Sequence, residues 1–180
     1  MKIAALLAGL AALLPQAAPE GHTHRITGLF SREREEDLKE AFKKVAGVVL
    51  LSVDFDRSEA VLSYDPSKLS NKKVEKEREK EILERLDNLL RSASTHTFGV
   101  KARCTTPADK LTRIEIGVAG LDCRGCGLAA YETVSKIDGV EQATASFKEG
   151  RVTALIDPAK TTRAALEEAL TKRGVKVLGP

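Results

Sequence analysis

The chain has 180 residues, 42% hydrophobic and 31% charged, which is the composition of a folded globular protein of one or two domains and is too apolar for extensive disorder. Lys and Arg total 29 against 26 Asp and Glu, and the resulting net charge of +3 excludes a nucleic-acid binder that relies on bulk positive charge. Three cysteines are too few for a disulfide scaffold, and their odd number leaves at least one thiol without an intrachain partner.

Residues 1–18 have the pattern of a secretory signal peptide. Lys2 precedes an apolar stretch, Ile3–Leu14, and proline and small residues follow it. A basic start, an apolar core and a small-residue end are typical of a segment that is removed on export. The apolar stretch is shorter than the roughly 18 residues that span a bilayer, so we expect a protein that does not span the membrane. The mature chain is therefore expected in the periplasm or outside the cell.

The next part of the chain predicts a strand, a helix, two strands, a second helix and a last strand. Alternating or β-rich segments predict the strands, which are 23–27, 48–55, 60–64 and 97–102. An apolar stripe at Leu38, Phe42 and Val45 predicts the first helix, which Gly47 ends. The charged segment 71–87 predicts that the second helix extends into solvent, and a partner-docking arm is the alternative.

The same order of elements returns after 92 residues. Between residues 28–68 and residues 120–160, 11 positions are identical without a gap, among them Gly28 with Gly120 and Phe55 with Phe147. Such a repeat indicates a duplicated domain. The second set of strands is predicted at 112–118, 140–147, 152–156 and 175–178.

We therefore predict an α+β fold made of two tandem ferredoxin-like βαββαβ domains, each an antiparallel sheet with two helices on one face. The first domain is expected over residues 22–103 and the second over residues 112–180. Residues 104–111 are the expected linker.

Cys123 and Cys126 lie at the predicted strand-to-helix junction of the second copy, in the sequence Gly-Leu-Asp-Cys-Arg-Gly-Cys. Thiols separated by two residues on such a loop can converge on one atom, and the N-terminus of the following helix lowers the pKa of a thiol. Two thiolates without further ligands suit Cu(I) or Hg(II), whereas Zn(II) prefers four ligands. There is no second CxxC sequence, and the three histidines lie in the first copy, so a zinc ribbon is not expected.

The Gly-Leu-Asp-Cys-x-x-Cys loop after a strand, the Gly139-Val140 pair after the helix and the βαββαβ order together resemble the heavy-metal-associated domain family. The resemblance covers 112–178 well and 23–102 as a divergent copy. It implies that Cys123 and Cys126 bind one soft metal ion, Cu(I) or Hg(II), and pass it on by thiolate exchange, with no organic cofactor. A metal-transporting membrane protein or another metal carrier is then the candidate partner.

Two residues before the first cysteine depart from the Met-Thr pair that the family usually has. Leu121 is expected to fill the same apolar position beneath the loop. Asp122 adds a negative charge beside the thiols, which should oppose thiolate formation and attract cations.

The first copy has no thiol at the matching loop, because the offset of 92 places Ser31 opposite Cys123 and Arg34 opposite Cys126. Ser31 is then the expected N-cap of the first helix, with acidic residues in the first turn. We expect this copy to be a structural or docking domain that binds no soft metal.

The remaining thiol, Cys104, has three open interpretations: a third ligand of the metal site, an intermolecular disulfide or a buried bystander. His22 and His24 lie near the expected mature N-terminus and could bind Cu(II) together with the free amine. We expect instead a flexible terminus with incidental histidines.

The sequence favours a non-enzymatic soft-metal binder or carrier. One alternative is a thiol–disulfide redox protein that uses Cys123 and Cys126, since CxxC at a helix N-terminus is also a redox motif. The other is a protein-interaction module in which the same pair forms an inert disulfide. No catalytic triad, P-loop or pair of catalytic carboxylates is recognisable in the sequence.

Overall fold

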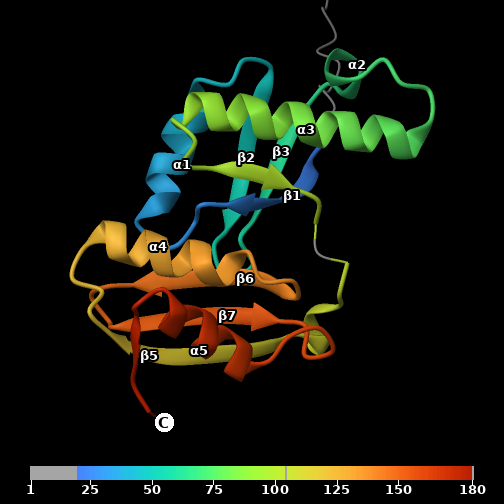
Figure 1. Ribbon diagram of the computed structural model, residues 1–180. Helices are drawn as coiled ribbons and strands as arrows, with labels where there is room; N and C mark the ends of the chain where they lie inside the picture. Colours follow the sequence, from blue (N-terminus) through green and yellow to red (C-terminus); the bar gives the residue numbers. More distant parts are fainter. Residues whose placement is uncertain (1–19, 104, 180) are drawn as a thin grey trace, which may run out of the picture.

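A computed structural model describes residues 20–103 and 105–179, so the predicted signal segment 1–18 and Cys104 lie outside the described residues. Two four-stranded antiparallel sheets lie one above the other, each with its own helices (Figure 1). Within the described ranges, no helix is both long and apolar enough to cross a membrane. The chain therefore has the α+β architecture with antiparallel sheets that its sequence predicts.

The N-terminal half forms the first sheet, in the order β2-β3-β1-β4. Its elements are β1 (His22–Thr27), α1 (Arg34–Lys43), β2 (Val48–Asp54), β3 (Glu59–Tyr64), α2 (Pro66–Leu69), α3 (Glu75–Ala93) and β4 (Gly99–Lys101). Asp65 begins α2 as an N-cap whose carboxylate accepts the backbone N–H of Ser67 at 2.9 Å, with proline at the first helical position.

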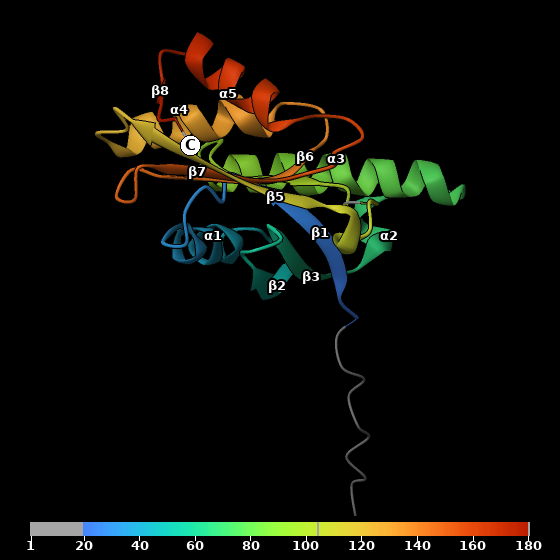
Figure 2. The same cartoon turned by 90° about the horizontal axis from the view of Figure 1, so that it is seen from below.

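The C-terminal half forms the second sheet, in the order β6-β7-β5-β8. Its elements are a short 3-10 helix η1 (Ala108–Lys110), β5 (Thr112–Ala119), α4 (Arg124–Ser135), β6 (Val140–Ser146), β7 (Arg151–Ile156), α5 (Arg163–Lys172) and β8 (Lys176–Val177). Helices α4 and α5 lie on the same side of this sheet (Figure 2).

The strand registers of the two halves match at the offset of 92. His22 faces Leu62 across β1 and β3, and Ile114 faces Ala154 across β5 and β7. The halves differ in where the register of one hairpin shifts. In the β2–β3 hairpin the shift lies between Leu50 and Ser52, and in the β6–β7 hairpin it lies between Val140 and Gln142. The connectivity and most of the pairing are thus the same in both.

Each half has its own apolar core between sheet and helices. In the first, α3 contributes Ile82, Leu86 and Leu90, which are spaced by one helical turn and buried. In the second, the core strands alternate, so that Ile116 and Val118 are buried while Glu115 is exposed. The charged first turns of α3 are exposed, as the sequence predicts.

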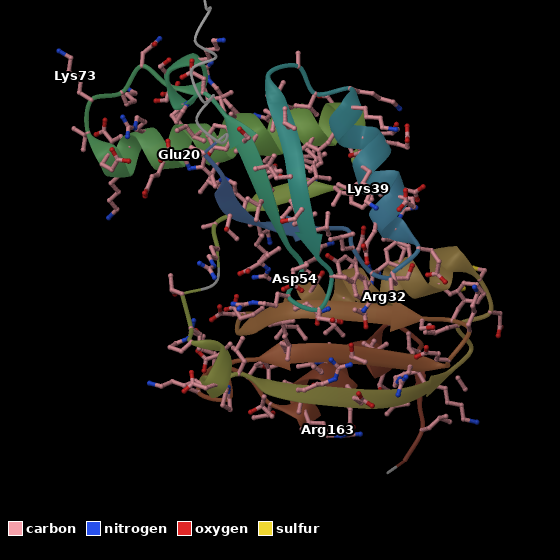
Figure 3. All side chains as sticks on the ribbon, turned by 180° about the vertical axis from the view of Figure 1, so that it is seen from behind. Glu20, Arg32, Lys39, Asp54, Lys73 and Arg163 are labelled. Carbon is pink, nitrogen blue, oxygen red and sulfur yellow. The ribbon has the colours of Figure 1, made fainter. Side chains whose placement is uncertain are left out.

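Phe30, from the loop between β1 and α1, is buried in the core of the opposite half, with 6% of its surface exposed. Its ring lies 6.0 Å from the ring of Tyr131 on α4. Its carbonyl accepts a hydrogen bond of 2.8 Å from the backbone N–H of Ala145 on β6. Figure 3 shows Arg32 and Asp54 at this end of the N-terminal half and Lys73 at the far end.

Two further contacts hold the halves together. The backbone N–H of Gly28 donates to the Tyr131 hydroxyl at 2.7 Å in a buried position. Gly28 has φ +93°, and a Cβ there would clash with the Thr97 carbonyl, so only glycine fits this turn. The Arg25 guanidinium pairs with Glu141 at 2.9 Å and also donates to the Val140 carbonyl at 2.9 Å.

One local prediction is wrong. Ser31 is not the N-cap of α1, because the helix begins at Arg34 and its N-cap, Glu33, is in a helical conformation without a side-chain cap. The Ser31 carbonyl instead accepts the backbone N–H of Arg34 at 3.0 Å. The loop continues past Ser31 because Leu29 is buried in the core of the N-terminal half and Phe30 in that of the C-terminal half.

The contact between the halves can be tested by truncating Phe30. Phe30→Ala should lower the free energy of unfolding by about 3–5 kcal/mol, because it leaves a cavity in a closed core. Tyr131→Phe keeps the ring but leaves the buried Gly28 N–H unpaired, which should cost about 1–3 kcal/mol. Urea unfolding of the full chain measures both. Phe147→Ala, at a ring that is 38% exposed, is the control with a clearly smaller loss, and an equal loss would contradict the role of Phe30.

Candidate metal centre

A tight turn after β5 positions the two cysteines. Gly120 has φ +82°, a left-handed conformation that glycine adopts without strain. Leu121 is buried in the core with 5% exposure, which confirms its expected place beneath the loop. Cys123 is extended and is the N-cap of α4, with its Sγ accepting the backbone N–H of Cys126 at 3.2 Å.

The turn brings the two sulfurs together at the surface. Cys123 Sγ and Cys126 Sγ lie 2.8 Å apart. Cys123 is exposed, whereas Cys126 is half-buried and packs against the apolar core. The predicted pair therefore shares one site, open on the Cys123 side.

The two thiols differ in acidity. Hydrogen bonds from the Cys126 side chain and backbone N–H hold the pKa of Cys123 below its ordinary value, against the opposing charge of Asp122. The same sulfur–sulfur contact, with desolvation and the Cys123 charge, raises the pKa of Cys126. Backbone hydrogen bonds at the helix N-terminus do lower the pKa of Cys126, as expected, but the contact with the Cys123 sulfur outweighs them.

Among the described residues, no third ligand joins the pair. Across residues 20–103 and 105–179, no three side chains of His, Cys, Asp or Glu gather closely enough to hold a metal ion. Within the described part of the chain, the pair offers two sulfurs, a ligand set that suits metals of low coordination number.

The matching loop of the N-terminal half is closed by an arginine. The Arg34 guanidinium lies 5.2 Å from the centre of the Phe30 ring and 5.1 Å from that of Phe98, and it pairs with Asp37 at 2.7 Å. Cation–π contact on two rings fixes this side chain. The offset of 92 places Ser31 and Arg34 opposite Cys123 and Cys126, and these contacts hold the Arg34 side chain against the loop.

The structure corrects the interpretation of His22 and His24. Both lie in β1 rather than in a flexible terminus, and His24 Nε2 is 2.9 Å from the Tyr64 hydroxyl. Burial lowers the pKa of His24 to about 4, and His22 acts in the same direction. His96 lies in the turn between α3 and β4, apart from the other two. Sequence analysis missed Tyr64, although the repeat aligns it with Ile156 and so marks an unusual polar residue.

The charge of Asp122 gives a testable pH dependence. Asp122→Asn removes the negative charge that opposes ionisation, so the pKa of Cys123 should fall further and its thiolate should persist to lower pH. Ultraviolet thiolate absorbance against pH, in a Cys104→Ser background, measures this. Asp138→Asn, beyond the far end of α4, is the control and should leave the titration unchanged. A rise in the pKa with Asp122→Asn would contradict the assigned charge effect.

Residues 115–176 match the heavy-metal-associated domain family. Human copper-transporting ATPase 2 is 27% identical over 161 residues, an alignment that covers 80% of this chain and 11% of the ATPase, so the chain spans about a tenth of that relative.

Similar solved structures each cover little more than a third of the chain. The N-terminal domain of a potential copper-translocating P-type ATPase from Bacillus subtilis is 28% identical, with 37% of this chain and 84% of that one covered and a TM-score of 0.36. The metallochaperone CopZ is 25% identical, with coverages of 37% and 100% and a TM-score of 0.37. Oxidized MerP from Ralstonia metallidurans CH34 is 24% identical, with coverages of 38% and 94% and a TM-score of 0.36. The segment that matches the heavy-metal-associated domain family, residues 115–176, includes Cys123 and Cys126.

Proposed function

We propose that this protein is a carrier of one soft metal ion, Cu(I) or Hg(II), which Cys123 and Cys126 bind and release without catalysing a reaction. The observation that carries the proposal is the convergence of two sulfurs, 2.8 Å apart, on an exposed loop of a heavy-metal-associated domain. Thiolates are soft ligands that select such ions, and a site with only two of them leaves Zn(II) short of ligands.

The unequal acidity of the pair suits capture and transfer. Cys123 is the readier thiolate and the exposed one, so it makes the first bond to an arriving ion. Binding to Cys126 then displaces its proton. In transfer, a thiolate of the acceptor bonds to the ion from the open side while the bond to Cys123 breaks. A metal-transporting membrane protein or another metal carrier is the acceptor that this chemistry fits.

The N-terminal half is proposed as a second, divergent copy of the same domain without a metal site. Support comes from the 11 identities at an offset of 92, and from the shared strand order and register. An alignment that covers 80% of the chain must also include parts of both halves, since neither half is that long. The role of this copy is structural, through Phe30 and Arg34.

A thiol–disulfide redox function is the second candidate. The depressed pKa of Cys123 beside the raised pKa of Cys126 is the asymmetry that a dithiol needs to attack a disulfide. A reduction potential in the range of cellular redox proteins, together with weak Cu(I) affinity, would favour this candidate. Tight metal binding favours the carrier.

We also propose that the protein is exported to the periplasm or outside the cell after removal of residues 1–18. The basic, apolar and small-residue order of this segment supports the proposal.

The metal proposal is tested by titration of the reduced protein under anaerobic conditions, read by intact-protein mass spectrometry. One equivalent of Cu(I) or Hg(II) should bind, and Cys123→Ser with Cys126→Ser should abolish tight binding, because both soft ligands are lost. Cys104→Ser is the matched control and should bind one equivalent as before. Full-strength binding in the double variant would exclude this site, and loss in the control would bring Cys104 into it.

Export is tested by the intact mass of the protein recovered from its native compartment. The mass should correspond to a chain that begins near residue 19. A full-length mass that includes Met1 would contradict export by cleavage.

A further inference from the structure

A cavity of about 480 Å³ lies in the N-terminal half, and neither Cys123 nor Cys126 lines it. Residues from the start of β1 and the first turns of α3 line it. Figure 1 labels these two elements. Figure 3 shows Glu20 and Lys73, which precede these two elements, at the end away from Arg32 and Asp54. His22, His24 and Tyr64 line the cavity, and Glu79 lines it from α3.

Three of these polar residues stand where the other half has isoleucine. The shared register places His22 opposite Ile114, His24 opposite Ile116 and Tyr64 opposite Ile156. Ile116 and Ile156 are 1% and 2% exposed core residues. Polar groups at core-facing positions reduce stability unless they are satisfied. The N-terminal half thus has three polar side chains, His22, His24 and Tyr64, at positions where the C-terminal half has isoleucine.

The imidazoles are held in place, but their ring nitrogens are not all used. The His22 ring stacks on Tyr64 with 4.5 Å between centroids. His24 Nε2 contacts the Tyr64 hydroxyl at 2.9 Å, and such a bond on one ring nitrogen orients a histidine so that the other nitrogen can bind a metal. His22 Nε2 is buried and has no hydrogen-bond partner among the described residues. The cavity therefore contains one orphaned imidazole nitrogen beside an oriented one.

The charges that line the cavity do not exclude a cation. Arg78 and Arg103 also line it, but Arg78 pairs with Glu75 at 2.6 Å and Arg103 with Glu59 at 3.2 Å. Glu79 has no ion pair in the part of the chain that the structure describes. Glu59 also pairs with Arg57 at 3.4 Å, and the lining itself holds two carboxylates and two guanidinium groups, so its charges balance and do not repel a cation.

We propose that His22 and His24 form a second metal site, for one divalent ion of borderline softness such as Zn(II) or Cu(II), with Tyr64 as the positioning residue. Residues i and i+2 of a strand project on the same face, so the two imidazoles can hold one ion between them. Imidazole suits Zn(II) and Cu(II), whereas the cysteine pair suits soft ions. Two imidazoles, like two thiolates, leave Zn(II) short of four ligands, so water completes its coordination in the cavity of about 480 Å³. The site is independent of the proposed carrier function.

The test uses the full chain with Cys104, Cys123 and Cys126 replaced by serine, so that no thiol binds or reduces the metal. Calorimetric titration should show one equivalent of Zn(II), and electron paramagnetic resonance of the Cu(II) form should show nitrogen ligands. His22→Ile with His24→Ile, the residues that the other half uses, should fold and lose binding. His96→Gln is the control and should bind as before. Tyr64→Phe should weaken binding by about tenfold, as loss of an orienting partner does.

Absence of Zn(II) and Cu(II) binding in the cysteine-free protein would overturn the proposal, as would unchanged binding after both isoleucine substitutions. Circular dichroism verifies that the variants are folded. A Zn(II)-induced rise in the melting temperature that His22→Gln alone abolishes would support the site even if the double variant does not fold. The His22→Ile/His24→Ile chain with its cysteines intact should still bind one Cu(I), which separates this site from the two-cysteine site.

Discussion

The relative placement of the two sheets depends on Phe30, a residue of the N-terminal half whose ring packs in the core of the C-terminal half. Phe30 fills a space in the core of the C-terminal half beside Tyr131, and removing such a ring from water stabilises the packed state by about 1.5–3 kcal/mol. The buried bond from Gly28 to the Tyr131 hydroxyl adds direction to this apolar contact. Tyr131 is on the helix that begins at the cysteines, so the two-cysteine loop is anchored through one rigid element to the other sheet.

The two halves use the same loop for opposite purposes. After β5 the loop turns outward and leaves a sulfur exposed, where a thiolate can meet an ion and later exchange it. After β1 the loop turns inward, and Arg34 lies between Phe30 and Phe98. The loop after β5 needs an accessible sulfur to react with an ion. The loop after β1 needs a buried ring to hold the two halves together, so one loop cannot serve both purposes.

The elements and the cysteine pair could be predicted from the sequence because local pattern determines them. Alternation gives β5, a one-turn spacing gives the apolar face of α1, and Gly120 with Leu121 marks the loop. The partner of Phe30 could not be predicted, since an apolar residue in a loop does not reveal which core it enters. Ser31 was wrongly predicted to be a cap because the burial of Leu29 and Phe30 delays the start of α1 to Arg34. His22 and His24 were wrongly assigned to a flexible terminus because they pair with Leu62 and Ala60 of β3, a long-range contact that no local pattern reports. The asymmetry of the two thiols follows from a sulfur–sulfur distance, which no sequence pattern reports.

The outer strand of the second sheet has a further property. An edge strand offers free backbone groups on which another chain can add a strand, and β6 is such an edge. Here the N–H of Ala145 donates to Phe30 near one end of β6, and the carbonyl of Val140 accepts from Arg25 at the other. The opposite edge, β8, is only two residues long. These two hydrogen bonds from the N-terminal half therefore hinder the addition of another strand to β6. A chain that lost them would be prone to aggregate through this edge.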